Sequence, residues 1–305
     1  MNQMPCTELD GGEIARLIPA RPADGDKRSF GSVLDVAGSA HFRGAAILSA
    51  EAALRLGAGY VTLACPRLVA NAVAARLPDA VLLPLRTRGG CVRGMEYRKV
   101  LLSAERASAV AIGCGLSSPS GGTESLRRFF KRVMLALSAR ETPVILDADG
   151  INLLAALQPL ALPGRLVMTP HERELARLLK TTVESVRADR EGSAVEAARR
   201  FRCVVVLKGH RSVITDGERS FVNPTGCSAL AKAGSGDVLT GMIAGLLAQG
   251  LAPLDAARAG VYLHGLAGEI AARELTEYGV LASDLSGFIP RAIGETLALL
   301  RSGGH

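Results

Sequence analysis

The chain has 305 residues, of which 48% are apolar and 21% are charged. This composition excludes a disordered chain, which combines low hydrophobicity with high net charge, and no three- or seven-residue period indicates collagen or a coiled coil. Lys and Arg number 36 against 29 Asp and Glu, which gives a net charge of +7. The excess favours an anionic partner. Because only 4% of the residues are aromatic, solvated helix faces explain the basic clusters better than a nucleic-acid surface does.

The six cysteines stand far apart, without a CxxC pair or a Cys/His spacing that suits zinc. They predict free thiols in a reducing compartment. The N-terminal segment lacks a basic stretch followed by an apolar one, and no run of about 20 apolar residues occurs. The sequence therefore predicts a cytoplasmic protein that has no membrane partner.

Short apolar runs alternate with longer segments of helical periodicity. The runs predict strands at residues 32–37, 60–65, 81–85, 109–112, 144–146, 166–168 and 203–207. The segments with helical periodicity include residues 45–56, 123–137, 172–179 and 194–201. Apolar strands separated by helical crossovers are typical of a parallel sheet that is covered on both faces. The pattern predicts an α/β protein, a three-layer α/β/α sandwich with a mostly parallel sheet.

The pattern changes in the last third of the chain. Residues 212–215 and 220–222 predict a tight strand pair at a sheet edge, with its turn at Asp216-Gly217. Three helices are predicted after it, at residues 237–248, 253–273 and 284–300. No linker separates domains, so a single domain over residues 1–305 is expected. Ligands of such sheets bind beyond the carboxyl ends of the strands, and the loops there are the candidate site.

The strongest site signal is Gly234-Ser235-Gly236-Asp237, which leads into a helix. Glycines let the backbone approach a ligand, and the amide N–H groups at a helix start attract anions. Asp237 is placed to take a proton from a substrate hydroxyl while these amides stabilise the phosphoryl group under attack. The alternative is that Ser235 or Asp237 only caps the helix.

A second signal is Lys208, which follows a buried strand and precedes Gly209. A lysine there can reach a phosphate, and the exposed turn over residues 208–212 can hold a nucleotide through backbone groups. The alternative is an ordinary hairpin turn with a surface lysine. Residues 223–226, Asn-Pro-Thr-Gly, either line the same pocket or form a turn.

Two carboxylates, Asp147 and Asp149, follow the strand at residues 144–146. Paired acids at the end of a strand suit Mg²⁺ that is held through water, or a proton relay. The alternative is that Asp149 caps a helix and an Asx turn forms beside it. Both interpretations remain open at this point.

The segment Thr169-Pro170-His171-Glu172 also follows a strand. His171 can donate a hydrogen bond to a ligand. Thr169 as a helix cap, with Pro170 at the first helical position, explains the same residues without a function.

Two familiar phosphate-binding motifs are missing. The chain contains no Gly-Lys pair and hence no GxxxxGK[ST] loop, and the segment at residues 113–118 lacks the third glycine of a dinucleotide fingerprint. Neither a P-loop enzyme nor a plain Rossmann dehydrogenase is favoured.

Small residues at 38–39 and 44–46 either admit a flat ligand or permit close helix packing.

Taken in order, these segments resemble the ADP-dependent NAD(P)H-hydrate dehydratases, a branch of the ribokinase-like fold. The resemblance spans roughly residues 27–270, and its segments occur in the order of the family. The matching segments are residues 38–39, 44–46, 113–116, 143–152 (PVILDADGIN), 169–172, 207–209, 223–226, 234–241 (GSGDVLTG) and 262–265. The chain departs from the usual pattern at Cys114, where proline is common, and at residues 172–174, which replace a more common Pro-Gly-Glu.

The resemblance implies a repair enzyme that restores NADH or NADPH from the (S) hydrate. The ring hydroxyl is phosphorylated and then lost as phosphate, and ADP yields AMP. Asp237 is implied as the base, with the amides of Gly234, Ser235 and Gly236 as an anion hole. The implied hydrate contacts are Ala46, Gly115, His171 and Asp237. The implied nucleotide contacts are Lys208, Gly209, His210, Arg211, Ser212, Asn223, Thr225 and Gly236.

The resemblance also implies Mg²⁺, a nucleotide co-substrate (ADP or ATP) and a homotetramer. Many relatives carry a fused epimerase domain. Because the first predicted strand begins near residue 32, we expect this chain to lack that domain and to depend on a separate NAD(P)H-hydrate epimerase. The alternative is a small-molecule kinase of the same fold, such as a hydroxyethylthiazole or sugar kinase, in which Asp237 would deprotonate an alcohol that stays phosphorylated.

Overall fold

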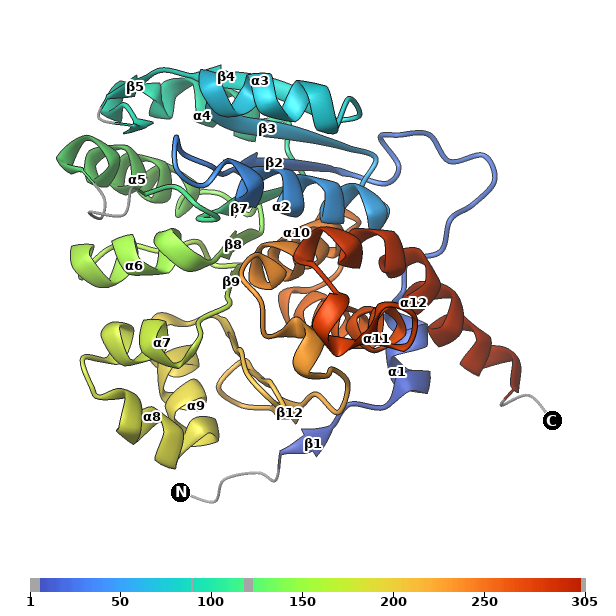
Figure 1. Cartoon of the computed structure of the whole chain (residues 1–305). Coiled ribbons are helices and arrows are strands. Elements are labelled where there is room, and N and C mark those ends of the chain that lie inside the picture. Colours follow the sequence, from blue (N-terminus) through green and yellow to red (C-terminus); the bar gives the residue numbers. More distant parts are fainter. Residues whose placement is uncertain (1–5, 89, 118–122, 303–305) are drawn as a thin grey trace.

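A ten-stranded sheet forms the centre of the molecule (Figure 1). The computed structural model describes residues 6–88, 90–117 and 123–302. From one edge to the other the strands are β1 (Thr7–Glu8), β12 (Ser220–Val222), β11 (Val213–Thr215), β10 (Val204–Leu207), β9 (Leu166–Met168), β8 (Val144–Leu146), β7 (Ala109–Ile112), β2 (Ser32–Val36), β3 (Tyr60–Pro66) and β4 (Val81–Leu85). Neighbours run parallel except at β11, which is antiparallel to β10 and β12.

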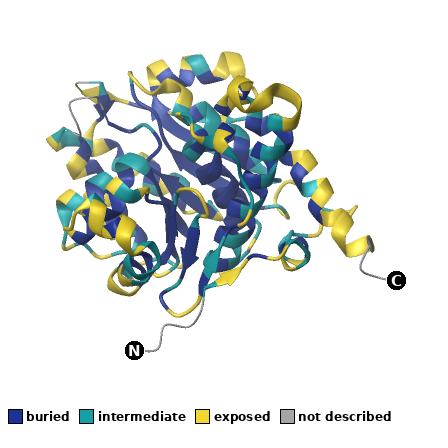
Figure 2. Ribbon diagram, turned by 60° about the horizontal axis from the view of Figure 1, so that its bottom comes forward, coloured by how far each residue is buried: buried dark blue, intermediate teal, exposed yellow. Residues whose placement is uncertain are grey.

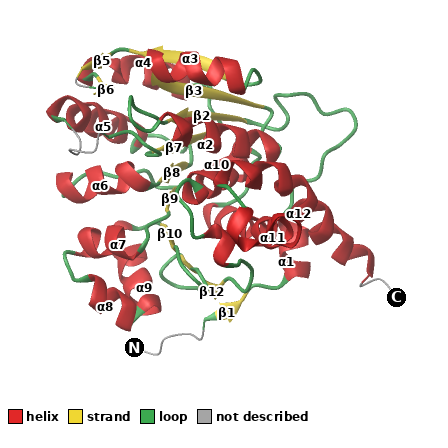
Figure 3. Ribbon diagram, in the orientation of Figure 1, coloured by secondary structure: helices red, strands yellow, loops and turns green. Residues whose placement is uncertain are grey.

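Helices cover both faces of the sheet, which gives three layers (Figure 3). One layer contains α1 (Gly11–Leu17), α2 (Arg43–Arg55), α3 (Arg67–Arg76), α10 (Ser235–Ala248), α11 (Pro253–Gly279) and α12 (Ala282–Ser302). The other contains α4 (Tyr97–Ala104), α5 (Glu124–Leu137), α6 (Ala148–Leu157), α7 (Glu172–Leu179), α8 (Val183–Ala188) and α9 (Arg190–Phe201). A two-stranded hairpin, β5 (Thr87–Arg88) and β6 (Cys91–Val92), and two 3-10 turns, Gly94–Glu96 and Ser228–Leu230, complete the elements.

The central strands, such as β2, β7 and β8, are buried on both faces, and Figure 2 shows the middle of the sheet in the dark blue of buried residues. In β2, Val33 packs in the apolar cluster under α2 and α10, and Leu34 packs in the cluster on the opposite face. Successive side chains of a strand point to opposite faces, so a continuous apolar run is what two covered faces require. The predicted three-layer sandwich with a mostly parallel sheet is confirmed.

The edge of the sheet differs from the prediction. The strand pair β11–β12 forms as expected, but β1 pairs with β12 and takes the outer position. The first strand therefore precedes residue 32, and the prediction that strands begin there was wrong. β1 is two residues long and both are exposed, so it has no apolar pattern for a sequence argument to detect. The opposite edge strand, β4, contains Pro84.

The parallel strands align their carboxyl ends at one edge of the sheet, where the loops leading to α2, α6 and α7 and the start of α10 meet. No helix in the described ranges combines the length and the apolar character that a bilayer crossing requires.

Candidate active site

The start of α10 is shaped by Gly234. Its φ is 95°, in the left-handed region, and a Cβ there would lie 2.6 Å from Leu48 Cδ1. No side chain caps this helix start, so the alternative that Ser235 or Asp237 serves as a cap is wrong. The amide of Ser235 donates to Lys232 O at 3.3 Å, whereas the amides of Gly236 and Asp237 donate to no other described residue. They remain open to a ligand.

A cavity of about 720 Å³ lies against this helix start. That volume is in the range of small-molecule sites, roughly 300–1,000 Å³. Its walls come from the loop before α2, the loop after β7, and the starts of α6, α7 and α10. The lining residues are Phe42, Ala45, Gly115, Ser117, Arg127, Ala148, Asp149, Asn152, Leu153, Ala156, Glu174, Arg177, Ala233, Gly234 and Asp237. The structure thus places the predicted site residues Gly115, Gly234 and Asp237 around one hollow.

Asp237 has a carboxyl whose proton affinity suits a general base. Burial, and after it the nearby charge of Asp147, raise its pKa to about 6, although the hydrogen bond with the Cys114 thiol and the charge of Lys208 act in the opposite direction. Oxygens of Asp147 and Asp237 and the sulfur of Cys114 all lie within 4.8 Å of one another. A carboxyl that titrates near neutral pH can take up a proton during turnover and release it afterwards.

Both carboxyl oxygens of Asp147 accept hydrogen bonds from neighbouring side chains. Its Oδ1 accepts from Lys208 Nζ at 2.5 Å, and its Oδ2 accepts from Thr240 Oγ1 at 2.8 Å. Lys208 Nζ also lies 3.9 Å from Glu174 Oε2. Burial lowers the pKa of Lys208, but Asp147 and Glu174 outweigh burial and raise it, so the ammonium stays charged. A Cβ on Gly236 would lie 3.4 Å from Lys208 Nζ, which places this charge beside the open amides.

Asp149 does not cap α6, contrary to the alternative drawn from the sequence. The N-cap of α6 is Asp147, and it makes no side-chain cap hydrogen bond. Asp149 Oδ2 instead accepts from the backbone N–H of Ser117 at 2.8 Å. This bond ties the loop after β7 to α6 and leaves a carboxylate on the wall of the cavity.

His171, and not Thr169, caps α7. Its Nδ1 accepts from the backbone N–H groups of Arg173 and Glu174 at 3.1 and 3.3 Å, and Glu174 Oε2 accepts from His171 N at 2.8 Å. Thr169 instead donates to Leu146 O at 3.3 Å from a fully buried position. Since Nδ1 is an acceptor, the ring proton sits on Nε2. Burial, together with Lys208, lowers the pKa of His171, so the ring is a neutral donor.

The two segments predicted to hold the nucleotide lie side by side. Asn223 N donates to Ser212 O at 2.9 Å, and Thr225 Oγ1 donates to Tyr262 O on α11 at 2.9 Å. Residues 209–211 are exposed, and Arg211 pairs with Glu8 at 2.7 Å. None of these residues lines the cavity at Asp237, so they form a separate surface that begins at Lys208.

The side chain of Ala46 does not reach the cavity. It is fully buried, and a Cβ on Gly38 would meet it at 3.1 Å. Its neighbour Ala45 lines the cavity instead, because successive helical residues point about 100° apart. Gly115 has a φ of 61°, and a Cβ there would lie 2.6 Å from Phe42 Cβ, so this position requires glycine.

Two residues that support the site, Thr240 and His264, were assigned no role from the sequence. Thr240 lies one turn after Asp237 and holds Asp147. His264 on α11 is buried, and its Nε2 lies 3.0 Å from Ser235 O and 3.2 Å from Ser235 Oγ. Burial lowers the pKa of His264 to about 4, so the neutral ring fixes the start of α10. For Thr240, the sequence offered one indication, which is that it lies three residues after Asp237 on the same predicted helix.

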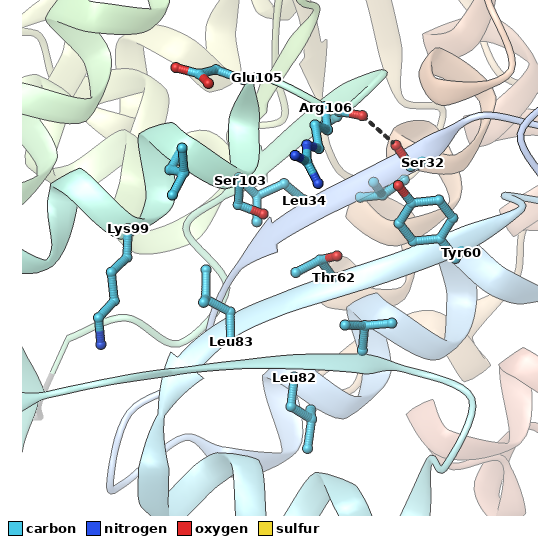
Figure 4. A pocket seen from close by; sticks show the side chains of 14 residues that line it. Ser32, Leu34, Tyr60, Thr62, Leu82, Leu83, Lys99, Ser103, Glu105 and Arg106 are labelled. Atoms are coloured by element: carbon cyan, nitrogen blue, oxygen red, sulfur yellow. Dashed lines mark hydrogen bonds between the residues drawn. The ribbon is translucent and has the colours of Figure 1, made fainter.

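Another cavity, of about 460 Å³, lies between α4 and the amino-terminal halves of β2, β3 and β4, away from the carboxyl ends of the strands (Figure 4). Its labelled residues Ser32 and Tyr60 begin β2 and β3, and α4 covers it. None of the predicted site residues lines it. The site therefore belongs to the carboxyl edge.

A mostly parallel sheet between helical layers, with open amides and a carboxyl at the start of a late helix, defines a ribokinase-like enzyme. A family model described as NAD(P)H-hydrate dehydratase matches residues 33–291. The chain belongs to the NAD(P)H-hydrate dehydratase family.

Similar proteins agree with this membership. The chain is 41% identical over 278 residues to the bifunctional NAD(P)H-hydrate repair enzyme Nnr of Moorella thermoacetica, covering 90% of this chain and 51% of that protein. The ADP/ATP-dependent NAD(P)H-hydrate dehydratase of Bacillus subtilis, co-crystallised with ATP/Mg²⁺, superposes with a TM-score of 0.81 at 32% identity over 96% of this chain and 100% of that one. The chain spans about half the length of the curated relatives it matches.

Proposed function

We propose that this chain catalyses the ADP-dependent dehydration of the (S) hydrate of NADH or NADPH, with AMP and phosphate as the other products. The observation that carries the proposal is the position of Asp237, whose carboxyl lies beside two open amides and a cavity of about 720 Å³ and whose pKa is raised by burial to about 6. The relatives named above support the substrate. The B. subtilis relative, co-crystallised with ATP/Mg²⁺, supports a nucleotide as co-substrate.

The reaction has two steps. Asp237 takes the proton of the ring hydroxyl, whose oxygen attacks the terminal phosphorus of ADP, so that a C–O–P bond forms and AMP leaves. The open amides of Gly236 and Asp237 and the ammonium of Lys208 stabilise the charge on the transferred group. The ring C–O bond then breaks, phosphate leaves with the bonding electrons, and the adjacent ring carbon loses its proton. NADH or NADPH results.

The donor set at the cavity fits Mg²⁺ through Asp149. Magnesium prefers oxygen ligands and keeps several of its waters. Both oxygens of Asp147 are occupied by Lys208 and Thr240, and a thiol such as Cys114 is a poor ligand for a hard cation. Of the two acids after β8, it is thus Asp149 that would hold Mg²⁺ together with the nucleotide phosphates, where the cation would neutralise phosphate charge.

The experiment is incubation of the chain with purified NADH hydrate or NADPH hydrate and ADP or ATP, with the absorbance of the reduced ring followed over time. We expect absorbance to return only with a nucleotide present and AMP to appear when ADP is used. No return of absorbance with either nucleotide, together with phosphorylation of a hydroxyethylthiazole or a sugar alcohol, would overturn the proposal in favour of a kinase. A hydroxyethylthiazole kinase from Pyrococcus horikoshii shares the fold with a TM-score of 0.62 at 16% identity.

The proposal extends to the setting of the enzyme. We propose a cytoplasmic homotetramer that receives the (S) hydrate from a separate NAD(P)H-hydrate epimerase and binds no nucleic acid. Light scattering after size exclusion tests the tetramer. A mixture of hydrate epimers tests the epimerase: turnover should stop when the (S) form is consumed and resume when an epimerase is added.

A further inference from the structure

A cavity of about 580 Å³ lies between the β5–β6 hairpin and α5. Arg88 and Arg93 from the hairpin segment and Arg128 and Arg132 from the helix line it, with Glu124 as the one carboxylate in its lining. Glu124 pairs only with Arg128, at 3.5 Å between exposed side chains. The hollow therefore presents a net excess of three positive charges. Such a concentration favours a multiply charged anion.

The arginines stand on anchored elements. Both residues of β6 are fully buried, and Gly94 N donates to Ser125 Oγ at 2.8 Å, which fastens the hairpin segment to the start of α5. Arg132 lies over the ring of Tyr97 at 4.9 Å and donates to its hydroxyl at 3.1 Å. Arg88 and Arg93 form no ion pair with a carboxylate of the described chain. Their guanidinium groups are thus free to bind an anion.

This cavity is a neighbour of the cavity at Asp237. The β5–β6 hairpin follows the carboxyl end of β4, and α5 follows β7, so both elements lie at the same edge of the sheet as the active site. Ala40 N donates to Gly90 O at 3.4 Å, which joins the hairpin to the loop that carries Phe42 into the active-site wall. On α5, Arg127 lines the active-site cavity and Arg128 lines the arginine cavity.

We propose that this arginine cavity binds the 2′-phosphate of NADPH hydrate while the hydrated ring lies at Asp237, and that the chain therefore prefers the phosphorylated dinucleotide. The inference rests on the proposed function, since it takes the hydrate as the substrate. A phosphate monoester carries close to two charges and accepts paired hydrogen bonds from the planar guanidinium fork. The free ribose hydroxyl of NADH hydrate offers neither feature.

The test is the double substitution R88A/R93A, which removes the two arginines without carboxylate partners. We expect wild-type kcat/KM to be at least about tenfold higher for NADPH hydrate than for NADH hydrate. The double variant should lose most of this preference through a raised KM for NADPH hydrate, with kcat/KM for NADH hydrate changing less than about threefold. The control is Arg140→Ala, a surface arginine that pairs with Glu105 outside both cavities.

Equal kcat/KM for the two hydrates in the wild type, or an equal loss for both in the variant, would overturn the inference. Calorimetric titration with NADP⁺ and NAD⁺ separates this result from failure of the proposed function, because binding needs no turnover. One outcome would support the phosphate site and contradict the proposed function. In it, neither hydrate is dehydrated, but NADP⁺ binds more tightly than NAD⁺, and the double variant loses this difference while the control variant keeps it. Binding of single-stranded DNA through the same arginines, with no difference between NADP⁺ and NAD⁺, would make the cavity a polyanion surface and contradict the inference.

Discussion

Asp237 is the residue on which the chemistry depends. Its carboxyl is half-buried beside Asp147, and this environment raises its pKa to about 6, so the ionised form can accept a proton in the first step. We expect Asp237→Asn to lower kcat by roughly 100- to 10,000-fold, because an amide cannot accept that proton. The affinity for ADP should stay within about threefold of wild type. Steady-state assays and calorimetry measure the two quantities.

The matched control for Asp237 is Asp24→Asn, which changes an exposed aspartate and should leave kcat unaltered. Turnover of the Asp237→Asn variant near the wild-type rate would show that another group is the base.

Lys208 has two functions that one substitution removes together. Its Nζ compensates the buried charge of Asp147 at 2.5 Å and lies beside Gly236. We expect Lys208→Ala to reduce the free energy of unfolding by about 3 kcal/mol, since breaking a buried ion pair leaves one charge uncompensated. ADP binding should weaken with less effect on hydrate binding. Denaturant titration and calorimetry measure both.

Unchanged ADP affinity in the Lys208→Ala variant would remove Lys208 from the nucleotide site and leave it a structural role. The variant Thr240→Ala is the control, because it withdraws the other hydrogen bond to Asp147 without removing a charge that can reach the phosphates.

At the scale of the element, the start of α10 contains two glycines, of which Gly234 needs the absence of a side chain for its conformation and Gly236 does not. Gly234 combines a φ of 95° with a Cβ position 2.6 Å from Leu48 Cδ1. At Gly236 the nearest atom to an added Cβ is Lys208 Nζ at 3.4 Å, an ordinary contact. We expect Gly234→Ala to cost about 1–3 kcal/mol of stability, whereas Gly236→Ala costs less than about 1 kcal/mol but raises the KM for ADP by crowding the open amides.

Thermal and denaturant unfolding of the two variants, together with nucleotide kinetics, distinguish these effects. Equal destabilisation by both substitutions would mean that the backbone conformation of Gly234 is not what shapes the helix start.

Some elements and contacts of the site could be predicted from the sequence, and others could not. The strand at Val144–Leu146 was predictable because apolar residues with no polar alternation fit only a strand covered on both faces. The segment 234–237 was predictable because its glycines and acid precede an apolar helix. The Lys208–Asp147 pair was not, because 61 residues separate the partners and only the order β8-β9-β10 brings them together. At α7, His171 and Thr169 are both competent caps, and local residue types do not decide between them.

At the scale of the whole molecule, buried acids make stability depend on pH. Burial raises the pKa of Asp35 to about 7, that of Glu174 to about 7 and that of Asp237 to about 6. Each folded-state pKa exceeds its unfolded value, so the folded chain holds more protons and loses stability as pH rises through these values. His264, whose pKa falls to about 4, has the opposite effect, but only between about pH 4 and 6.5.

Asp35 gives the clearest part of this dependence. Ser49 Oγ lies 2.5 Å from Asp35 Oδ2 and 3.0 Å from Ala45 O. One hydroxyl proton can serve only one of these oxygens, so both bonds form when Asp35 is protonated. We expect stability to fall between pH 6.5 and 8, with roughly 1 kcal/mol of the loss due to Asp35. Asp35→Asn should reduce the loss by that amount, since asparagine keeps the shape and a donor.

Denaturant unfolding of the wild type and of Asp35→Asn at the two pH values measures this difference. The same pH dependence in both proteins would assign the effect to Glu174 and Asp237 instead.

The two outer strands of the sheet limit how copies of the chain can associate. Within the described residues β1 is two residues long, and Pro84 removes a backbone donor from β4. Both outer strands are therefore poor templates for a further strand, which disfavours continuation of the sheet of one copy into the sheet of the next. If copies of the chain associate, we therefore expect them to do so through side chains of the outer helices, with strand addition disfavoured at both ends.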